Sequence, residues 1–101
     1  KRNKKMSVKV TLNCQVKSDM FGALLPFLEE NLPHVRGFKG NLQVRVLFDE
    51  KNNEMLLDEE WLTVDSHQAY LSFIGENGVL QQLGSFLQAP PQIKYFNHVE
   101  I

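Results

Sequence analysis

Hydrophobic and polar residues alternate along three stretches of the chain, and this period of two is the pattern of a strand that buries one face. The stretches cover residues 7–16, 41–50 and 54–63, and a shorter one over 92–99 predicts a fourth strand. The apolar positions of the first stretch are Val8, Val10, Leu12, Cys14 and Val16. We therefore expect four strands that each turn one face toward a hydrophobic core.

The apolar residues between these strands recur every three or four positions, which is the spacing of an amphipathic helix. This spacing predicts a helix over 18–35, a second over 65–74 and a short third over 79–87. Pro26 lies inside the first helix, where a proline removes a hydrogen bond, so we expect a kink there. Asp65 has a side chain that favours a helix N-terminus, so the second helix is expected to begin at this residue.

The predicted order of elements is strand, helix, strand, strand, helix, short helix, strand. Two strand–helix–strand units around a central hairpin form the split ferredoxin-like arrangement. The expected fold class is therefore α+β, namely a ferredoxin-like βαββαβ domain with a four-stranded antiparallel sheet and its helices on one face.

The face of the sheet that the helices leave open is expected to be partly apolar. Its candidates are Leu56 and Leu62, or Met55 and Trp61, on the third strand, and Phe96 or Tyr95 on the last. An apolar face of this kind is unfavourable in water, and a two-fold partner would bury it on both protomers. We therefore predict a homodimer that packs sheet against sheet.

Composition adds a few constraints. The length of 101 residues, with 43% hydrophobic and 23% charged residues, predicts one globular domain over 6–101. Four basic residues fall within 1–5, which we interpret as a basic leader or a remnant of an expression tag. The rest of the chain is acidic, so no nucleic-acid partner is expected.

The single cysteine, Cys14, precludes an intrachain disulfide and indicates a reducing, cytoplasmic location. No apolar run approaches the ~20 residues of a membrane span, so no membrane contact is expected.

The usual catalytic and metal-binding motifs do not occur in the sequence, and we expect no bound metal. The run of acids at 58–60 alternates sides of its strand, so only Asp58 and Glu60 can share a face. Glu59 lies on the same side as Trp61 and needs a hydrogen-bond donor if it is buried.

A second candidate cluster lies at the start of the second helix. His67 and Tyr70 are three residues apart and share one helix face, which Ile74 extends by a turn. Two interpretations remain open. One is a packed tyrosine beside a half-buried histidine, and the other is one wall of a pocket between helix and sheet, with Trp61 as the opposite wall. The role of Asn13, on the polar side of the first strand, is left open.

Four segments together resemble the antibiotic biosynthesis monooxygenase-like domains of the dimeric α+β barrel superfamily. They are "LPHVRGFKGNLQVRVLFDE" (32–50), "DEEW" (58–61), "DSHQAYLSF" (65–73) and "PPQIKYF" (90–96). Glu59 and Trp61 match the Glu-x-Trp strand end of that family. The resemblance implies a homodimer with a pocket between sheet and helices in each protomer. Relatives include enzymes that oxidise quinols or polyketide phenols with O₂ and neither metal nor flavin.

The chain departs from this resemblance at one histidine, which many relatives carry nine residues after the tryptophan. Tyr70 stands at that position, and His67 lies one turn earlier. Haem-degrading relatives combine an asparagine on the first strand and an aromatic residue early in the second helix, which Asn13 and Tyr70 match, with a later histidine. Residues 75–87 contain no histidine. Haem degradation is therefore disfavoured and no cofactor is expected, while a haem ligand stays open.

The sequence supports three hypotheses of function. The first is a cofactor-independent monooxygenase that oxidises a small aromatic, quinol-type substrate with O₂, with His67 as the base and Tyr70 or Asn13 as its hydrogen-bonding partner. The second is a non-enzymatic dimeric module for small-molecule binding or protein interaction, and the third is a haem-binding or haem-degrading relative. The residues expected to contact the substrate in the first hypothesis are Trp61, Glu59 and Ile74.

Overall fold

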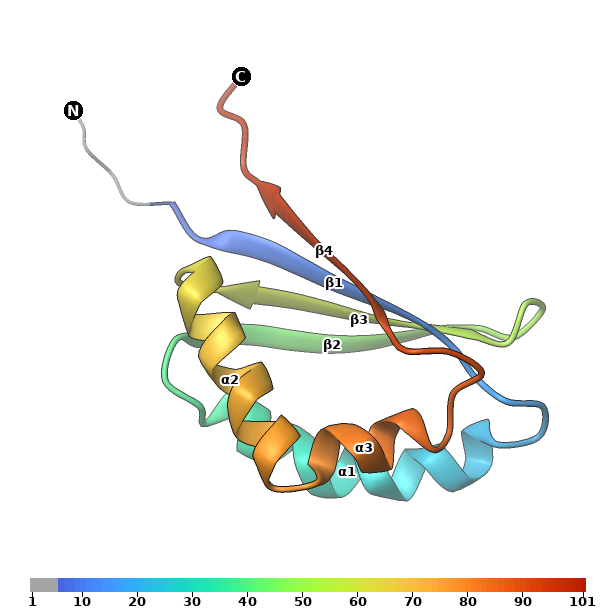
Figure 1. Cartoon of the computed structure of the whole chain (residues 1–101). Coiled ribbons are helices and arrows are strands. Elements are labelled where there is room, and N and C mark those ends of the chain that lie inside the picture. The colour runs from blue at the N-terminus through green and yellow to red at the C-terminus, as the bar shows by residue number, and fades with distance from the viewer. Residues whose placement is uncertain (1–5) are drawn as a thin grey trace.

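The computed structural model describes residues 6–101, so the predicted leader at 1–5 lies outside the described residues. The elements follow the predicted order along the chain (Figure 1). They are β1 (Val8–Gln15), α1 (Phe21–Arg36), β2 (Asn41–Asp49), β3 (Glu54–Trp61), α2 (Val64–Glu76), α3 (Val79–Gly84) and β4 (Gln92–Asn97). Among the described residues, no helix has both the length and the apolar character needed to cross a membrane.

Within residues 6–101, four strands form one antiparallel sheet in the order β2-β3-β1-β4. The helices all lie against one face of this sheet and leave the other face open (Figure 1). The central strands β1 and β3 are far apart in the sequence and become neighbours because the chain crosses over through α1. The predicted ferredoxin-like βαββαβ fold is thereby confirmed.

The alternation of β1 sends its apolar side chains into the space between the sheet and the helices. Val10 and Cys14 are fully buried there. Val10 is in register with Glu59 of β3 on one side and with Tyr95 of β4 on the other. Residues paired across neighbouring strands point to the same face of a sheet. Glu59, Val10 and Tyr95 therefore form a row on the face that the helices cover.

The structure decides between the alternatives for the open face. Met55 and Trp61 are fully buried under the helices, so Leu56 is on the open side of β3. Tyr95 faces the helices together with Val10, so Phe96, which is 51% exposed, is on the open side of β4.

The starts of both long helices differ from the predicted ones. α1 begins at Phe21 instead of 18, and it continues through Pro26 as one helix. α2 begins one residue before Asp65, because the N-cap is Thr63, whose Oγ1 accepts a hydrogen bond from Ser66 N–H at 3.0 Å. A threonine hydroxyl satisfies one of the free N–H groups of a helix start, so the prediction that Asp65 begins the helix is wrong.

The loop before β2 packs closely on the first turn of α2. Gly40 has a φ of +95°, and a Cβ atom added there would lie 2.6 Å from both Cβ and Oγ of Ser66. The Gly40 carbonyl accepts a hydrogen bond from Leu62 N–H at 2.8 Å. Only glycine combines this backbone conformation with the close approach. The contact holds the first turn of α2, and with it His67, against the end of β3.

We predict that Gly40→Ala lowers the free energy of unfolding by about 1–3 kcal/mol, because the methyl group strains both the backbone and the contact with Ser66. Gly75→Ala is the matched control: Gly75 lies in α2 with open space around an added Cβ. That change is expected to be neutral or to stabilise by up to ~1 kcal/mol. Urea unfolding measures both, and equal stability of Gly40→Ala and the unaltered protein would contradict the prediction.

Candidate functional site

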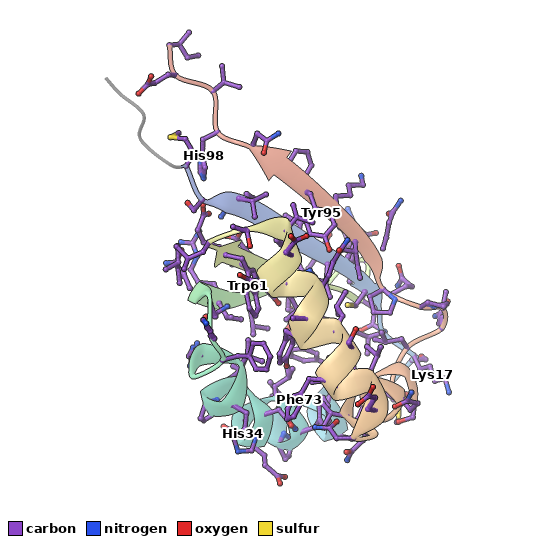
Figure 2. The ribbon with its side chains drawn as sticks, turned by 60° about the vertical axis from the view of Figure 1, so that its left-hand side comes forward. Lys17, His34, Trp61, Phe73, Tyr95 and His98 are labelled. Atoms are coloured by element: carbon purple, nitrogen blue, oxygen red, sulfur yellow. The ribbon has the colours of Figure 1, made fainter. Side chains whose placement is uncertain are left out.

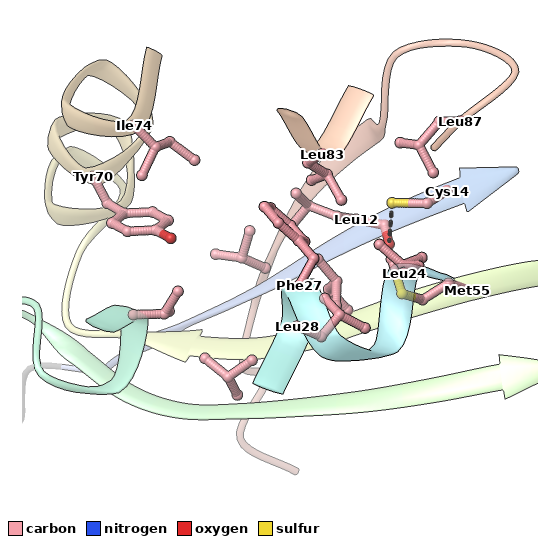
Figure 3. Close-up of a cluster of buried hydrophobic side chains, with 14 of the residues drawn as sticks. Leu12, Cys14, Leu24, Phe27, Leu28, Met55, Tyr70, Ile74, Leu83 and Leu87 are labelled. Carbon is pink, nitrogen blue, oxygen red and sulfur yellow. Dashed lines mark hydrogen bonds between the residues drawn. The ribbon is translucent and has the colours of Figure 1, made fainter. Parts of the chain in front are cut away.

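A small cavity of about 50 Å³ lies between the helix-covered face of the sheet and the three helices of the described chain. Figure 3 shows Tyr70 and Ile74 of α2 on one side, across from Phe27 and Leu28 of α1 and Leu83 of α3. Most of the wall is aliphatic or aromatic. Its polar side chains are Asn31, Glu59, His67 and Tyr70.

Glu59 on β3 brings a carboxyl group into this apolar wall. It is 4% exposed, and Trp61 Nε1–H donates a hydrogen bond to its Oε1 at 2.8 Å. Burial raises the pKa of Glu59 from 4.5 to about 7, the indole N–H opposes part of that rise, and the charge of Asp58 adds to it. A carboxyl group with this pKa gains and loses its proton near neutral pH.

Trp61 is fully buried, and its indole ring does not line the cavity. Its ring centroid lies 5.3 Å from that of His67, 5.5 Å from that of Tyr70 and 6.2 Å from that of Phe38. The structure therefore places Trp61 inside the core, where it contacts the predicted His67/Tyr70 face directly instead of lying across a pocket from it. Its contribution to the site is the N–H that holds Glu59.

His67 in α2 is 1% exposed, and so is more buried than the half-buried histidine of the sequence interpretation. Its Nδ1 lies 2.8 Å from Tyr95 Oη, and its Nε2 lies 3.9 Å from Glu59 Oε1. Burial lowers the pKa of His67 from 6.5 to about 4. The imidazole is therefore neutral at physiological pH, and its approach to Glu59 is a contact between a neutral ring and a carboxyl group, not an ion pair.

A surface groove of about 610 Å³ between α1 and α2 adjoins the cavity. Phe73 and His34, both labelled in Figure 2, line it from the two helices. Because Tyr70 and Ile74 border both spaces, rotation of these two side chains would join the cavity to the groove. The residues that line both spaces are Asn31, Tyr70, Ile74 and Val79.

The structure separates Asn13 from this site. Asn13 lies on the open face of the sheet, where its Nδ2 donates a hydrogen bond to Glu54 Oε2 at 2.8 Å. Asp58 also lies on that face, between Lys9 Nζ and Arg45 Nη2, each 2.6 Å away. The described residues contain no group of three or more His, Cys, Asp or Glu side chains that could hold a metal ion.

Tyr95 belongs to the site, although the sequence did not assign it there. Figure 2 shows it close to the first turns of α2, and its Oη contacts His67. The alternation of β4 places Ile93 and Tyr95 on one face and Phe96 on the other, so both faces carry large apolar side chains. Only the register with β1, which pairs Tyr95 with Val10, decides which face meets the helices.

The fold is that of the antibiotic biosynthesis monooxygenase proteins. No family model matches the chain, and no curated protein matches its sequence. Solved structures match it over nearly its whole length. One of them, an antibiotic biosynthesis monooxygenase, has 15% sequence identity and a TM-score of 0.80, with 92% of this chain and 99% of that chain covered.

Two further solved structures match the chain over most of its length. The monooxygenase from the gene ActVA-Orf6 of Streptomyces coelicolor, in complex with nanaomycin D, matches with a TM-score of 0.77 at 11% identity, covering 96% of this chain and 91% of that chain. A conserved protein from Methanosarcina mazei Go1 matches with a TM-score of 0.79 at 14% identity, covering 91% and 92%. At these identities the likeness establishes a shared fold.

The hydrogen bond between Trp61 and Glu59 gives a direct test of the site, because Trp61 is the single tryptophan of the chain. We predict that its fluorescence titrates with a midpoint near pH 7, as the carboxyl group beside the indole ionises. Glu59→Gln keeps an oxygen acceptor for the indole and should abolish the transition. A transition that persists in Glu59→Gln would show that another group titrates.

Proposed function

We propose that this protein is a cofactor-independent monooxygenase that oxidises a small, electron-rich phenol or quinol with O₂. The observation that carries the proposal is Glu59, a carboxyl group with a pKa raised to about 7 in the wall of an otherwise apolar cavity. A base with this pKa is well matched to accepting a proton near neutral pH. The fold shared with the S. coelicolor monooxygenase supports the same class of reaction.

The substrate supplies the electrons in this reaction. For a phenol with a hydrogen opposite its hydroxyl group, Glu59 takes the phenolic proton, and the phenolate passes one electron to O₂. The resulting phenoxyl radical and superoxide combine at the opposite ring carbon, and Glu59 returns its proton to the peroxide. The O–O bond then breaks as the hydrogen on that carbon leaves as a proton. One phenol and one O₂ thus give one quinone and one water.

Glu59 is better suited than His67 to accept the substrate proton. The sequence analysis assigned this role to His67, but burial lowers the pKa of its imidazole to about 4, which makes it a weak base. Burial raises the pKa of Tyr70 to about 12, so its hydroxyl keeps its proton. In this proposal Tyr70 donates a hydrogen bond to the substrate oxygen while Glu59 removes the proton.

The substrate would occupy the cavity together with the adjoining groove. The cavity, at about 50 Å³, is smaller than the roughly 150 Å³ that accommodates a benzene ring. The groove, at about 610 Å³, has room for a ring and carries the aromatic side chains of Phe38 and Phe73. Rotation of Tyr70 and Ile74 would bring the substrate oxygen from the groove to Glu59.

We predict O₂ uptake when the protein is mixed with members of a panel of phenols and quinols, with one atom of ¹⁸O₂ entering each quinone formed. Glu59→Gln should lower kcat by about 10²–10⁴-fold, because the amide accepts no proton. Glu30→Gln makes the same chemical change at an exposed position of α1 and should leave kcat unchanged. A panel that yields no uptake, or a Glu59→Gln variant with full activity, would contradict the proposal.

The apolar lining of the cavity and of the adjoining groove favours a second candidate function, the binding of an apolar molecule without turnover. A molecule that fits beside Tyr70 and Ile74 would change the packing around Trp61, and its binding would appear as a saturable change in tryptophan emission. Saturable emission changes across the panel without O₂ consumption would support this binding function and contradict the monooxygenase.

We also propose that the protein forms a homodimer through the open face of its sheet. Leu47 and Phe96 on this face are 49% and 51% exposed, and Leu56 lies half-buried between their strands. Asp58, at the centre of this face, already forms ion pairs with Lys9 and Arg45 within one protomer. Exposed apolar residues beside charges that are already paired form a surface that a second copy of the sheet can cover.

We predict that Phe96→Asp converts the dimer to a monomer, because it places a charge without a partner in the interface. Phe73→Asp is the matched control, since Phe73 is 52% exposed but lies on α2, on the opposite side of the sheet. Light scattering coupled to gel filtration measures both masses. A mass that is the same for Phe96→Asp and the unaltered protein would contradict the proposed interface.

A further inference from the structure

Glu59, His67 and Tyr95 come from three different elements and form a line that leads from the cavity toward the surface. His67 Nε2 lies 3.9 Å from Glu59 Oε1, and His67 Nδ1 lies 2.8 Å from Tyr95 Oη. We propose that these side chains form a proton relay between the cavity carboxyl group and solvent at β4. The proposal rests on the proposed function in one respect, the assignment of Glu59 as the group that accepts the substrate proton.

The sheet sets the length of this line. Glu59 and Tyr95 both pair with Val10, from opposite sides, so they are separated by two strand spacings, or roughly 10 Å. Their polar groups form no direct hydrogen bond across this gap. The imidazole of His67 spans it from α2, with one ring nitrogen toward each partner. Glu59 and His67 are buried, and Tyr95 is partly exposed, so the line ends where solvent is accessible.

The proton on the Tyr95 hydroxyl gives a direction to its hydrogen bond with His67. Burial raises the pKa of Tyr95, so its hydroxyl keeps its proton near neutral pH. The Tyr95 hydroxyl can then donate its own proton to His67 Nδ1. In the neutral imidazole this leaves the proton on Nε2, where it points toward the carboxylate of Glu59.

The relay moves one proton without leaving a charge on the imidazole. To carry a proton inward, Nε2 gives its proton to the Glu59 carboxylate, Nδ1 takes the proton of Tyr95, and Tyr95 takes one from solvent. The reverse sequence carries a proton out. The 3.9 Å between Nε2 and Oε1 exceeds a hydrogen bond, so transfer requires rotation of Glu59 or one bridging water. The cavity of about 50 Å³ is large enough for that water.

The other titratable groups that face Glu59 within residues 6–101 are poor carriers of its proton. Asp58 raises the pKa of Glu59 by its charge but lies on the opposite face of the sheet. Burial and the charge of Glu59 raise the pKa of both Cys14 and Tyr70 to about 12, and neither side chain has a hydrogen bond that leads to an exposed group within the described residues. The imidazole and the Tyr95 hydroxyl remain as the connection to solvent.

The relay couples the ionisation of Glu59 to the tautomer of His67, and this coupling can be measured without any substrate. The ¹⁵N chemical shifts of a labelled imidazole distinguish its protonated from its unprotonated nitrogen. We predict that His67 changes from the Nδ1–H form to the Nε2–H form with the same midpoint, near pH 7, as the Trp61 fluorescence. A His67 tautomer that stays constant through that transition would overturn the relay.

Tyr95→Phe removes the outer hydroxyl and keeps the ring. Without it, the Nε2–H form is no longer favoured beside the carboxylate, so we expect the tautomer change to be lost and the Trp61 midpoint to rise by roughly 0.5–1 pH unit. Tyr70→Phe is the matched control, because it removes a neighbouring buried hydroxyl outside the line and should keep the tautomer change. A Tyr95→Phe protein that keeps the coupled transition of the unaltered protein would overturn the relay.

Turnover separates this proposal from the proposed function. Tyr95→Phe is expected to lower kcat by roughly 10-fold, with KM unchanged and the pH profile shifted upward. If His67 and Glu59 titrate together but no phenol consumes O₂, the monooxygenase fails and the relay stands. If O₂ is consumed and Tyr95→Phe retains the kcat and pH profile of the unaltered enzyme, the relay fails and the monooxygenase stands.

Discussion

One buried carboxyl group, Glu59, constrains the structure around it. A carboxyl group in an apolar interior destabilises the fold unless it is neutral or hydrogen-bonded, and Trp61 supplies a donor at 2.8 Å. That bond depends on strand alternation, which puts both side chains on the helix-covered face, and on the packing of Phe38 against the indole. The close contact at Gly40 in turn seats the helix that carries His67. The geometry of the site thus extends from β3 through its neighbouring loop to α2.

Glu59 and His67 oppose each other in their effects on stability. The pKa of Glu59 is raised from 4.5 to about 7, so between these pH values the folded state holds a proton that the unfolded chain has released. The stability that this bound proton contributes is lost as the pH rises through 7. The pKa of His67 is lowered from 6.5 to about 4, so its contribution is lost as the pH falls through that interval. Between pH 4.5 and 6.5 the opposite changes in stability with pH cancel, and Glu59 and His67 are both neutral in the folded state.

The fold and half of the site follow from local patterns in the sequence. Alternation alone places Glu59 with Trp61 and puts Asp58 on the other face, because the period of a strand is independent of the rest of the fold. The same alternation put Asn13 on the polar side of β1, where the structure finds it; only its resemblance to family residues suggested a role in the pocket. Tyr95 could not be assigned, because both faces of β4 are apolar and the register across the sheet is a long-range property.

A small cavity fits the proposed chemistry because the basicity of Glu59 depends on the exclusion of water. Burial is the largest cause of its raised pKa, so a cavity open to solvent would lower that pKa and weaken the base. A substrate oxygen that reaches in from the groove past Tyr70 and Ile74 would fill the space that water could otherwise occupy. Substrate binding and base strength are then linked, because both increase as the site becomes drier. A shared fold cannot create this link by itself; it arises from the side chains that surround one carboxyl group.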